Sequence, residues 1–281
     1  IPRVFGAGVY QLTVFIDTFC ASLSTIVGPG GISAIYYANR IIQFPMGIFT
    51  FALASAVLPT LSGLASQNQT EQMKKTIVFA LENLFFVLFP TSVMMIIFST
   101  PVIRLLFERG EFDSYSTAIT SLALMCSAFG LFSFGGIKIL VTAFHALQDT
   151  KTPVKVAALC LVINAVLNFI LMFPLKVGGI ALASSIAATI DFFILFYFLE
   201  KRLGRFNSGL RQFVLKVLIA SFAAGVATYS AWHFLSFFSE LIKFITVGIG
   251  GMAFYGIVSI WLRIPQAQKI QEWLLAKNKA L

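Results

Sequence analysis

The chain has 281 residues, of which 58% are hydrophobic and only 11% are charged, and its formal net charge is +9. With a mean hydropathy of +0.91, this composition excludes an ordinary soluble domain and indicates an all-α protein that crosses a membrane several times. No alternating ten-residue pattern of an outer-membrane barrel is present. The cysteines, Cys20, Cys126 and Cys160, lie in apolar stretches and form no CxxC pair, so we expect small buried residues rather than metal or redox ligands.

Eight apolar stretches are each long enough to cross a hydrocarbon core of about 30 Å as a helix. They cover approximately residues 4–26, 32–62, 77–100, 115–146, 153–174, 178–199, 212–235 and 241–263. The charged segment 101–113 is too short to span, and it is expected to lie along the outer face as a short amphipathic helix. The sequence therefore predicts a membrane bundle of eight transmembrane helices followed by a basic tail.

The basic residues between these stretches predict the orientation. Most of them fall on the side of the two termini, and the loop from Lys201 to Arg211 is the richest in positive charge. Lys and Arg are enriched in cytoplasmic loops, so both termini of this chain are expected in the cytoplasm. The net charge then reflects topology, and no nucleic-acid partner is expected. There is no initiator Met and no cleavable signal peptide, and the first span begins at once, which suggests a piece of a longer chain.

Two cations lie inside predicted spans. Arg40 lies in the second span, one turn before Pro45, where the proline predicts a helix bend. An arginine near the bilayer centre costs about 2.5–3.5 kcal/mol on insertion scales. It is therefore expected to face a cavity, although snorkelling to the headgroups is an alternative. Lys138 lies in the fourth span, where it either joins Arg40 in a cationic cavity or pairs with Glu82 or Asp17. Two such cations suit an anionic substrate, especially phosphate oxygens.

Several oxygen-bearing side chains also lie inside spans. Asp17 is in the first span, Asn164 and Asn168 are four residues apart in the fifth and so share one helix face, and Ser184 is in the sixth. Carboxylate, amide, hydroxyl and backbone carbonyl oxygens are the ligands that a small hard cation prefers. Hydrogen bonding between neighbouring helices is the alternative role for these residues.

Catalysis of covalent chemistry is not expected. The sequence has no nucleophile–base pair, nucleotide-binding loop, HExxH motif or zinc spacing. Asp191 and Glu82 lie within a few turns of predicted cytoplasmic ends, where they are expected to be interfacial or paired. His145 and His233 stand near predicted helix ends, and the sequence places neither in a catalytic acid–base motif. The protein is therefore predicted not to be an enzyme.

Three blocks of the sequence resemble one family. YYANRIIQFPMGIFTFALASAVLPTLS, LLFERGEFD and FHALQDTKTPVKVA resemble, in order and spacing, the MurJ/MviN lipid II flippases of bacterial peptidoglycan synthesis. These proteins belong to the multidrug/oligosaccharidyl-lipid/polysaccharide exporter superfamily. The resemblance covers residues 1 to about 205 well. It implies that 1–205 form the second six-helix lobe, that 206–263 form two extra helices beside a groove for the lipid tail, and that 264–281 form a cytoplasmic basic tail. A first, N-terminal lobe would be missing from the chain.

The resemblance also implies roles for particular residues. Arg40 matches a cavity-facing arginine that engages the pyrophosphate of the lipid, and Lys138 and the neighbouring Asn39 join it in the predicted substrate site. Some relatives bind sodium, and no other cofactor is implied. The implied sodium ligands here are Asp17, Asn164, Asn168, the carbonyl of Ile180, and Ser184. Asn168 replaces a carboxylate of those relatives, which lowers the charge of the site, and other relatives lack the carboxylate at the position of Asp17.

The implied function is to flip lipid II, the undecaprenyl-diphosphate-linked peptidoglycan precursor, from the inner to the outer leaflet by alternating access. The expected location is the bacterial cytoplasmic (inner) membrane, and the expected partners are lipid II, membrane lipids and the missing lobe. One alternative is an exporter of drugs or other polyprenyl-linked glycans in the same superfamily. Another is a membrane scaffold that transports nothing and recruits partners through the basic loop 201–216 and the tail.

Overall fold

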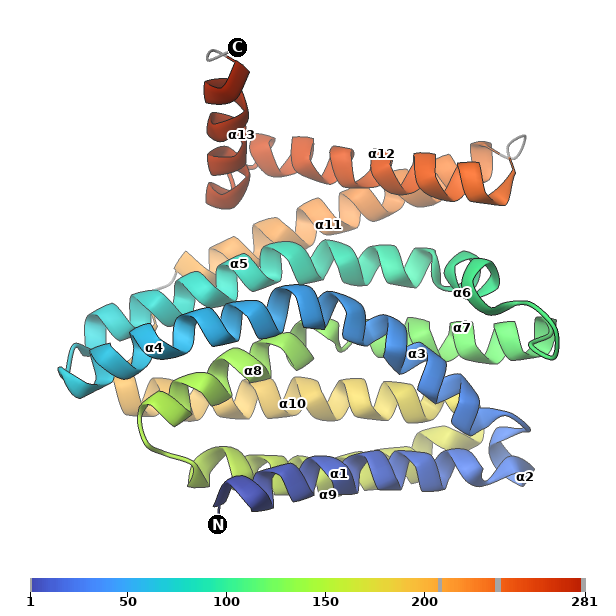
Figure 1. Cartoon of the computed structure of the whole chain (residues 1–281), viewed down its shortest axis with the longest axis horizontal. Helices are drawn as coiled ribbons and strands as arrows, with labels where there is room; N and C mark the ends of the chain where they lie inside the picture. Colours follow the sequence, from blue (N-terminus) through green and yellow to red (C-terminus); the bar gives the residue numbers. More distant parts are fainter. Residues whose placement is uncertain (1, 207–208, 236–238, 279–281) are drawn as a thin grey trace.

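A computed structural model describes residues 2–206, 209–235 and 239–278. In these residues every regular element is a helix (Figure 1). The helices are, in chain order, α1 (Pro2–Ser22), α2 (Ser24–Val27), α3 (Gly31–Pro45), η1 (Met46–Phe51), α4 (Ala52–Ser66), α5 (Thr70–Ile97), α6 (Ser99–Phe107), α7 (Ser114–Ala128), α8 (Leu131–Ala146), α9 (Lys151–Leu175), α10 (Val177–Leu203), α11 (Gly209–Phe234), α12 (Glu240–Trp261) and α13 (Pro265–Asn278).

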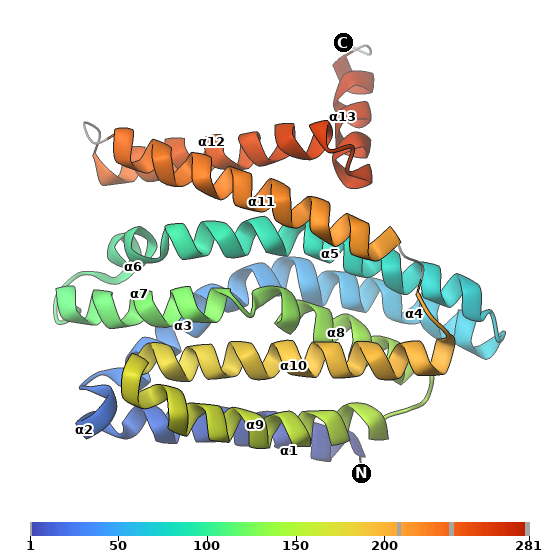
Figure 2. The same ribbon diagram turned by 180° about the vertical axis from the view of Figure 1, so that it is seen from behind.

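The long helices run side by side as a bundle, as expected where lipid offers the backbone no hydrogen-bond partner (Figures 1 and 2). Six segments of the described chain are long and apolar enough to span a membrane: α3 to α4 as one segment, α5, α9, α10, α11 and α12. The bent pair α7–α8 makes a seventh. α1, where the first span is predicted, is not among them, but it packs along α9. The predicted all-α membrane bundle is confirmed, and its eight spans correspond to these seven segments and α1.

The helix that carries Arg40 changes its winding at Pro45. α3 ends at this proline, and the chain continues as the π-helical segment η1 before α4 begins. Proline has no N–H and its ring displaces the carbonyl four residues earlier, so an interrupted hydrogen-bond ladder is expected here. A π-helical turn inside a longer helix often marks a functional site.

The fourth predicted span is not one straight helix, because α7 and α8 are bent by 46° relative to each other. The break leaves backbone carbonyls without helical partners, and neighbouring hydroxyls satisfy two of them. Ser185 of α10 donates to the carbonyl of Cys126 at 2.8 Å, and Ser92 of α5 donates to the carbonyl of Ala128. Gly130 lies in the break so close to Ser185 that an added Cβ would stand 2.8 Å from its Cα. A glycine therefore allows α8 to begin against α10.

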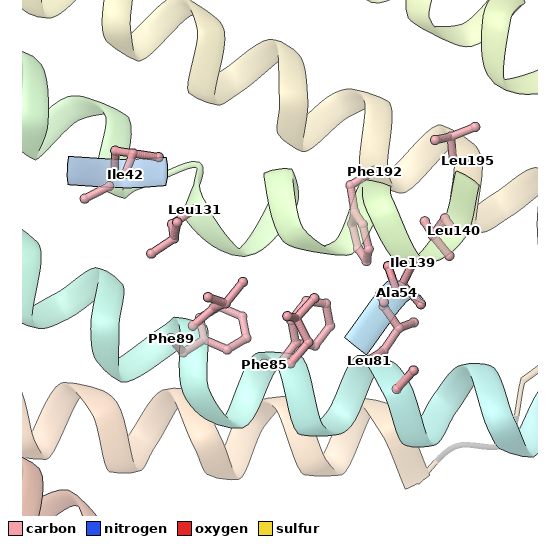
Figure 3. Packing of buried hydrophobic residues seen from close by; sticks show 14 of the residues in the cluster. Ile42, Ala54, Leu81, Phe85, Phe89, Leu131, Ile139, Leu140, Phe192 and Leu195 are labelled. Atoms are coloured by element: carbon pink, nitrogen blue, oxygen red, sulfur yellow. The ribbon is translucent and has the colours of Figure 1, made fainter. Parts of the chain in front are cut away.

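An aromatic cluster forms the centre of the bundle between α5, α8 and α10. Phe89 and Phe132 stack with ring centroids 5.0 Å apart, and Phe85 meets Phe192 edge-on at 5.8 Å. Figure 3 shows Phe85, Phe89 and Phe192 among the packed side chains of this core. Gly136 of α8 lies under the Phe192 ring, where an added Cβ would be 2.5 Å from a ring carbon. This contact holds α8, the helix that carries Lys138, against α10.

The helices α11 and α12 pack on each other, and α11 packs along α5 (Figure 2). Small residues permit this approach, since an added Cβ on Gly225 would stand 2.6 Å from Val93 of α5. Tyr255 of α12 also reaches α5, where its hydroxyl donates to the carbonyl of Phe86 at 2.8 Å. α5 contains Pro90, which cannot donate to that carbonyl. The Tyr255 hydroxyl therefore supplies the hydrogen bond that the backbone of α5 cannot give to the Phe86 carbonyl.

Candidate functional site

Three polar side chains from α9 and α10 surround Asp17 of α1. The Asn168 amide nitrogen donates to one carboxylate oxygen of Asp17 at 2.7 Å, and the Ser184 hydroxyl donates to the other at 2.8 Å. Asn164 completes the cluster, since its amide nitrogen donates to the Ser184 oxygen at 3.0 Å and its oxygen accepts from Asn168 at 3.2 Å. Asn164 and Asn168 are 1% and 0% exposed, so this polar network lies inside the bundle.

The cluster borders a cavity of about 30 Å³, enough for one or two small species such as water or a cation. Asp17, Ser184 and Ile180 line it, with Ile35 and Asn39 of α3, Ala123 and Ser127 of α7, Phe134 of α8 and Ala181 of α10. The Asn168 side-chain oxygen is buried without a hydrogen-bond partner in the described chain. A buried oxygen that accepts no hydrogen bond can instead bind a cation. The oxygen atoms of this cluster therefore fit a small hard cation.

The residues predicted for a sodium site are therefore brought together, although they lie far apart along the chain. Asp17 comes from α1, the two asparagines come from α9, and Ile180 and Ser184 come from α10. The alternative role, hydrogen bonding between neighbouring helices, is also present in the same geometry. Asn39, which the sequence places with Arg40, is exposed and also lines the Asp17 cavity.

Arg40 is exposed on α3. Its guanidinium donates to the Tyr36 hydroxyl at 3.0 Å and to the Gln43 side-chain oxygen at 3.4 Å, and it lies 4.9 Å from the centre of the Tyr36 ring. These partners are neutral, and no described acidic side chain pairs with Arg40. The guanidinium therefore keeps an uncompensated positive charge that can bind an anion.

Lys138 is also exposed, and its ammonium lies 5.1 Å from the centre of the Phe51 ring in η1. The sequence left open a pairing of Lys138 with Glu82 or Asp17, and the described residues contain neither pair. Glu82 instead faces Gln266 and Lys269 of α13, while Asp17 is held by neutral donors. Arg40 thus lies on the helix that leads into η1, and Lys138 lies over Phe51 at the end of η1; neither cation has an acidic partner among the described residues.

One polar cluster at a helix start was not found by sequence reasoning. Asp149, in the block FHALQDTKTPVKVA, accepts hydrogen bonds from the backbone N–H groups of Lys151 and Thr152 at 3.1 and 3.0 Å, and from Arg202 of α10 at 2.5 Å. Partial burial alone would raise the pKa of Asp149, but the Thr152 hydrogen bonds and the Arg202 charge hold it below the ordinary 3.8. The Asp-x-x pattern before a helix is the signal that could have identified this cap.

Comparison with known proteins identifies the family. The family model described as lipid II flippase MurJ matches residues 1–248. Proteins named probable lipid II flippase MurJ from Buchnera aphidicola and Haemophilus influenzae are 31% and 30% identical over 90% and 99% of this chain. The chain spans about half the length of these curated relatives, since it covers 50% and 55% of them.

Solved structures give the same result. A lipid II flippase MurJ in an inward closed conformation superposes with a TM-score of 0.74 and 28% identity, over 91% of this chain and 51% of that chain. A protein from Pyrococcus furiosus described as a MOP superfamily transporter superposes with a TM-score of 0.58 over 96% of this chain and 65% of that chain. At 17% identity, this second likeness shows the fold alone. The chain is a multi-pass membrane protein of the MurJ family of lipid II flippases, a family of transporters rather than enzymes.

Proposed function

We propose that this chain supplies one lobe of a flippase that moves lipid II from the inner to the outer leaflet of the bacterial cytoplasmic membrane. Residues 1–205 would form the second lobe, 206–263 two further helices beside the lipid tail, and 264–281 a cytoplasmic tail. The relatives are about twice as long, so a first lobe would complete the central cavity. Both termini of the chain would lie in the cytoplasm, in accord with its basic loops.

The observation that carries this proposal is the pair of unneutralised cations, Arg40 and Lys138, in membrane-spanning helices. A cation without a partner inside a membrane is costly and is expected to serve function. Arg40 presents the planar donor group that binds phosphate oxygens at two points, and Lys138 adds a second positive charge. The diphosphate of the lipid would bind these cations while its polyprenyl chain stays in the bilayer. A rocking motion of the two lobes would then expose the headgroup on the other side.

Complementation of bacteria depleted of their own lipid II flippase tests this role. The full-length protein with Arg40→Ala should lose support of growth at normal protein level, because the diphosphate loses its main partner. Arg40→Lys should restore part of it, since charge returns without the two-point geometry. The matched control is Arg211→Ala, another exposed arginine, at the start of α11.

The outcomes separate the alternatives. Full growth with Arg40→Ala would refute the phosphate-binding role, and it would favour an exporter of another substrate. Loss of growth with Arg211→Ala but not with Arg40→Ala would favour a scaffold that acts through the basic loop 201–216. Equal loss in both variants, with both proteins present at normal level, would also contradict the proposal.

We also infer that the Asp17 cavity binds sodium. The carboxylate of Asp17, the oxygens of Asn164, Asn168 and Ser184, and the Ile180 carbonyl would hold the ion, which would supply positive charge between α1, α9 and α10. In the full-length protein, sodium should raise the melting temperature more than potassium does, because a ligand bound only to the folded state stabilises it. Asp17→Asn should remove the difference. A parent protein with equal melting temperatures in both salts would refute the site.

A further inference from the structure

Asp191 is an acidic residue within a helix long and apolar enough to span the membrane, and neither candidate site uses it. It lies near the middle of α10, 12 residues before the end of the helix at Leu203, because α10 continues beyond the predicted span end at residue 199. One of its carboxylate oxygens is buried and has no hydrogen-bond partner in the described chain, and Asp191 takes part in none of the ion pairs found there. A carboxylate at this depth is expected to be neutralised or to serve function.

The position of Asp191 relates it to the Asp17 cavity. Asp191 lies two helical turns from Ser184 on the same face of α10, roughly 10 Å along the helix. On the neighbouring α9, Cys160 lies one turn from Asn164, and Asp191 acts electrostatically on its thiol. Both Cys160 and Asn164 are buried. The contact between α9 and α10 therefore carries polar groups at two levels. The first is the cluster around Asp17, and the second, one to two turns further along, holds the Asp191 carboxyl and the Cys160 thiol.

The ion pairs of the described residues include none between Asp191 and a cation of the helices packed against α10; on α9 these cations are Lys151 and Lys155. α8 carries Lys138, which lies over Phe51, and His145, which lies near the end of that helix. α3 carries Arg40, which is held by Tyr36 and Gln43, and α7 carries Cys126. Among the side chains described on α1, Asp17 is itself acidic and Cys20 is a buried thiol. None of the described ion pairs joins a cation to Asp191.

The side chains around Asp191 favour a proton rather than a metal cation as its ligand. A metal cation needs several oxygen ligands, as the Asp17 cluster provides, whereas no hydrogen bond links Asp191 to another oxygen-bearing side chain in the described residues. A single proton neutralises a carboxylate without any further ligand. We propose that Asp191 is a proton-binding site within the membrane. Its carboxyl takes a proton from water, holds it in the resting protein, and returns it to water when the surroundings open.

Infrared spectroscopy of the purified full-length protein in lipid nanodiscs tests this site directly, without any transport assay. At neutral pH, Asp191→Asn should lose one carbonyl-stretch band of a protonated carboxylic acid relative to the parent. The matched control is Asp113→Asn. Asp113 lies outside the spans, and its carboxyl accepts a hydrogen bond from the Ser116 backbone N–H at 2.8 Å. Hydrogen bonds from Ser116 lower the pKa of this carboxyl. This control should lose only a carboxylate band.

Asp191→Glu keeps a carboxylic acid at this position but should shift its carbonyl-stretch band. If Asp191→Asn does not fold, this shift still assigns the band to residue 191. Loss of a carboxylate band instead of an acid band in Asp191→Asn, or an unshifted acid band in Asp191→Glu, would overturn the proposal. The result does not depend on lipid II or sodium binding, so either outcome leaves the proposed function to be judged by its own experiments.

Discussion

Replacement of Tyr255 of α12 by phenylalanine should destabilise the protein, because it leaves a backbone carbonyl of α5 without a hydrogen bond. Pro90 leaves the Phe86 carbonyl of α5 without its helical hydrogen bond, and the Tyr255 hydroxyl supplies one at 2.8 Å from a side chain that is only 5% exposed. Side-chain hydrogen bonds between membrane helices average about 0.6 kcal/mol. A buried acceptor left unpaired costs about 1–3 kcal/mol. We therefore expect Tyr255→Phe to cost about 1–2 kcal/mol of unfolding free energy.

A double-mutant cycle with Pro90→Ala isolates this effect. Alanine restores the N–H that bonds the Phe86 carbonyl, so in the Pro90→Ala background Tyr255→Phe should cost less than half as much, a coupling of about 0.5–1.5 kcal/mol. The assay is equilibrium unfolding of the full-length protein in mixed detergent micelles. Tyr197→Phe, at a tyrosine that is 61% exposed, is the matched control and should change little. An equal cost of Tyr255→Phe in both backgrounds would refute the argument.

Two further predictions concern the connections of α9. Gly179→Ala should destabilise the protein by about 1–3 kcal/mol, because an added Cβ would collide with the Leu171 carbonyl. The control Gly63→Ala should not, because the space around Gly63 is open. Equal melting temperatures of the two variants would count against the close approach at Gly179. Asp149→Ala should cost about 0.5–2 kcal/mol at pH 7 through loss of the helix cap and of the Arg202 contact. Since the pKa of Asp149 is lowered in the folded state, this cost should be constant above about pH 5 and should shrink as the pH falls through and below 3.8. A cost independent of pH in thermal melts down to pH 3 would contradict the cap.

Much of the candidate cation site could be predicted because its signals are local. Asn164 and Asn168 share a face of α9 by their spacing, and this pairing is present in the structure. Asp17 and Ser184 are recognisable as polar residues inside apolar spans. Their meeting with the asparagines was implied by the family resemblance, and in the structure the packing of α1 and α10 against α9 produces it. Helix periodicity gives no information about such distant pairs.

The sequence by itself determined the membrane class, the approximate limits of the long helices, and which cationic and oxygen-bearing side chains lie within them. These follow from length and apolarity, because a helix in lipid satisfies its backbone within one continuous segment. Only the tertiary structure decided where helices break and which faces meet. The break between α7 and α8 at Gly130 and the bond of Tyr255 to α5 both depend on groups from other helices. In a bilayer the lipid-facing and buried faces are similarly apolar, so composition alone does not distinguish them.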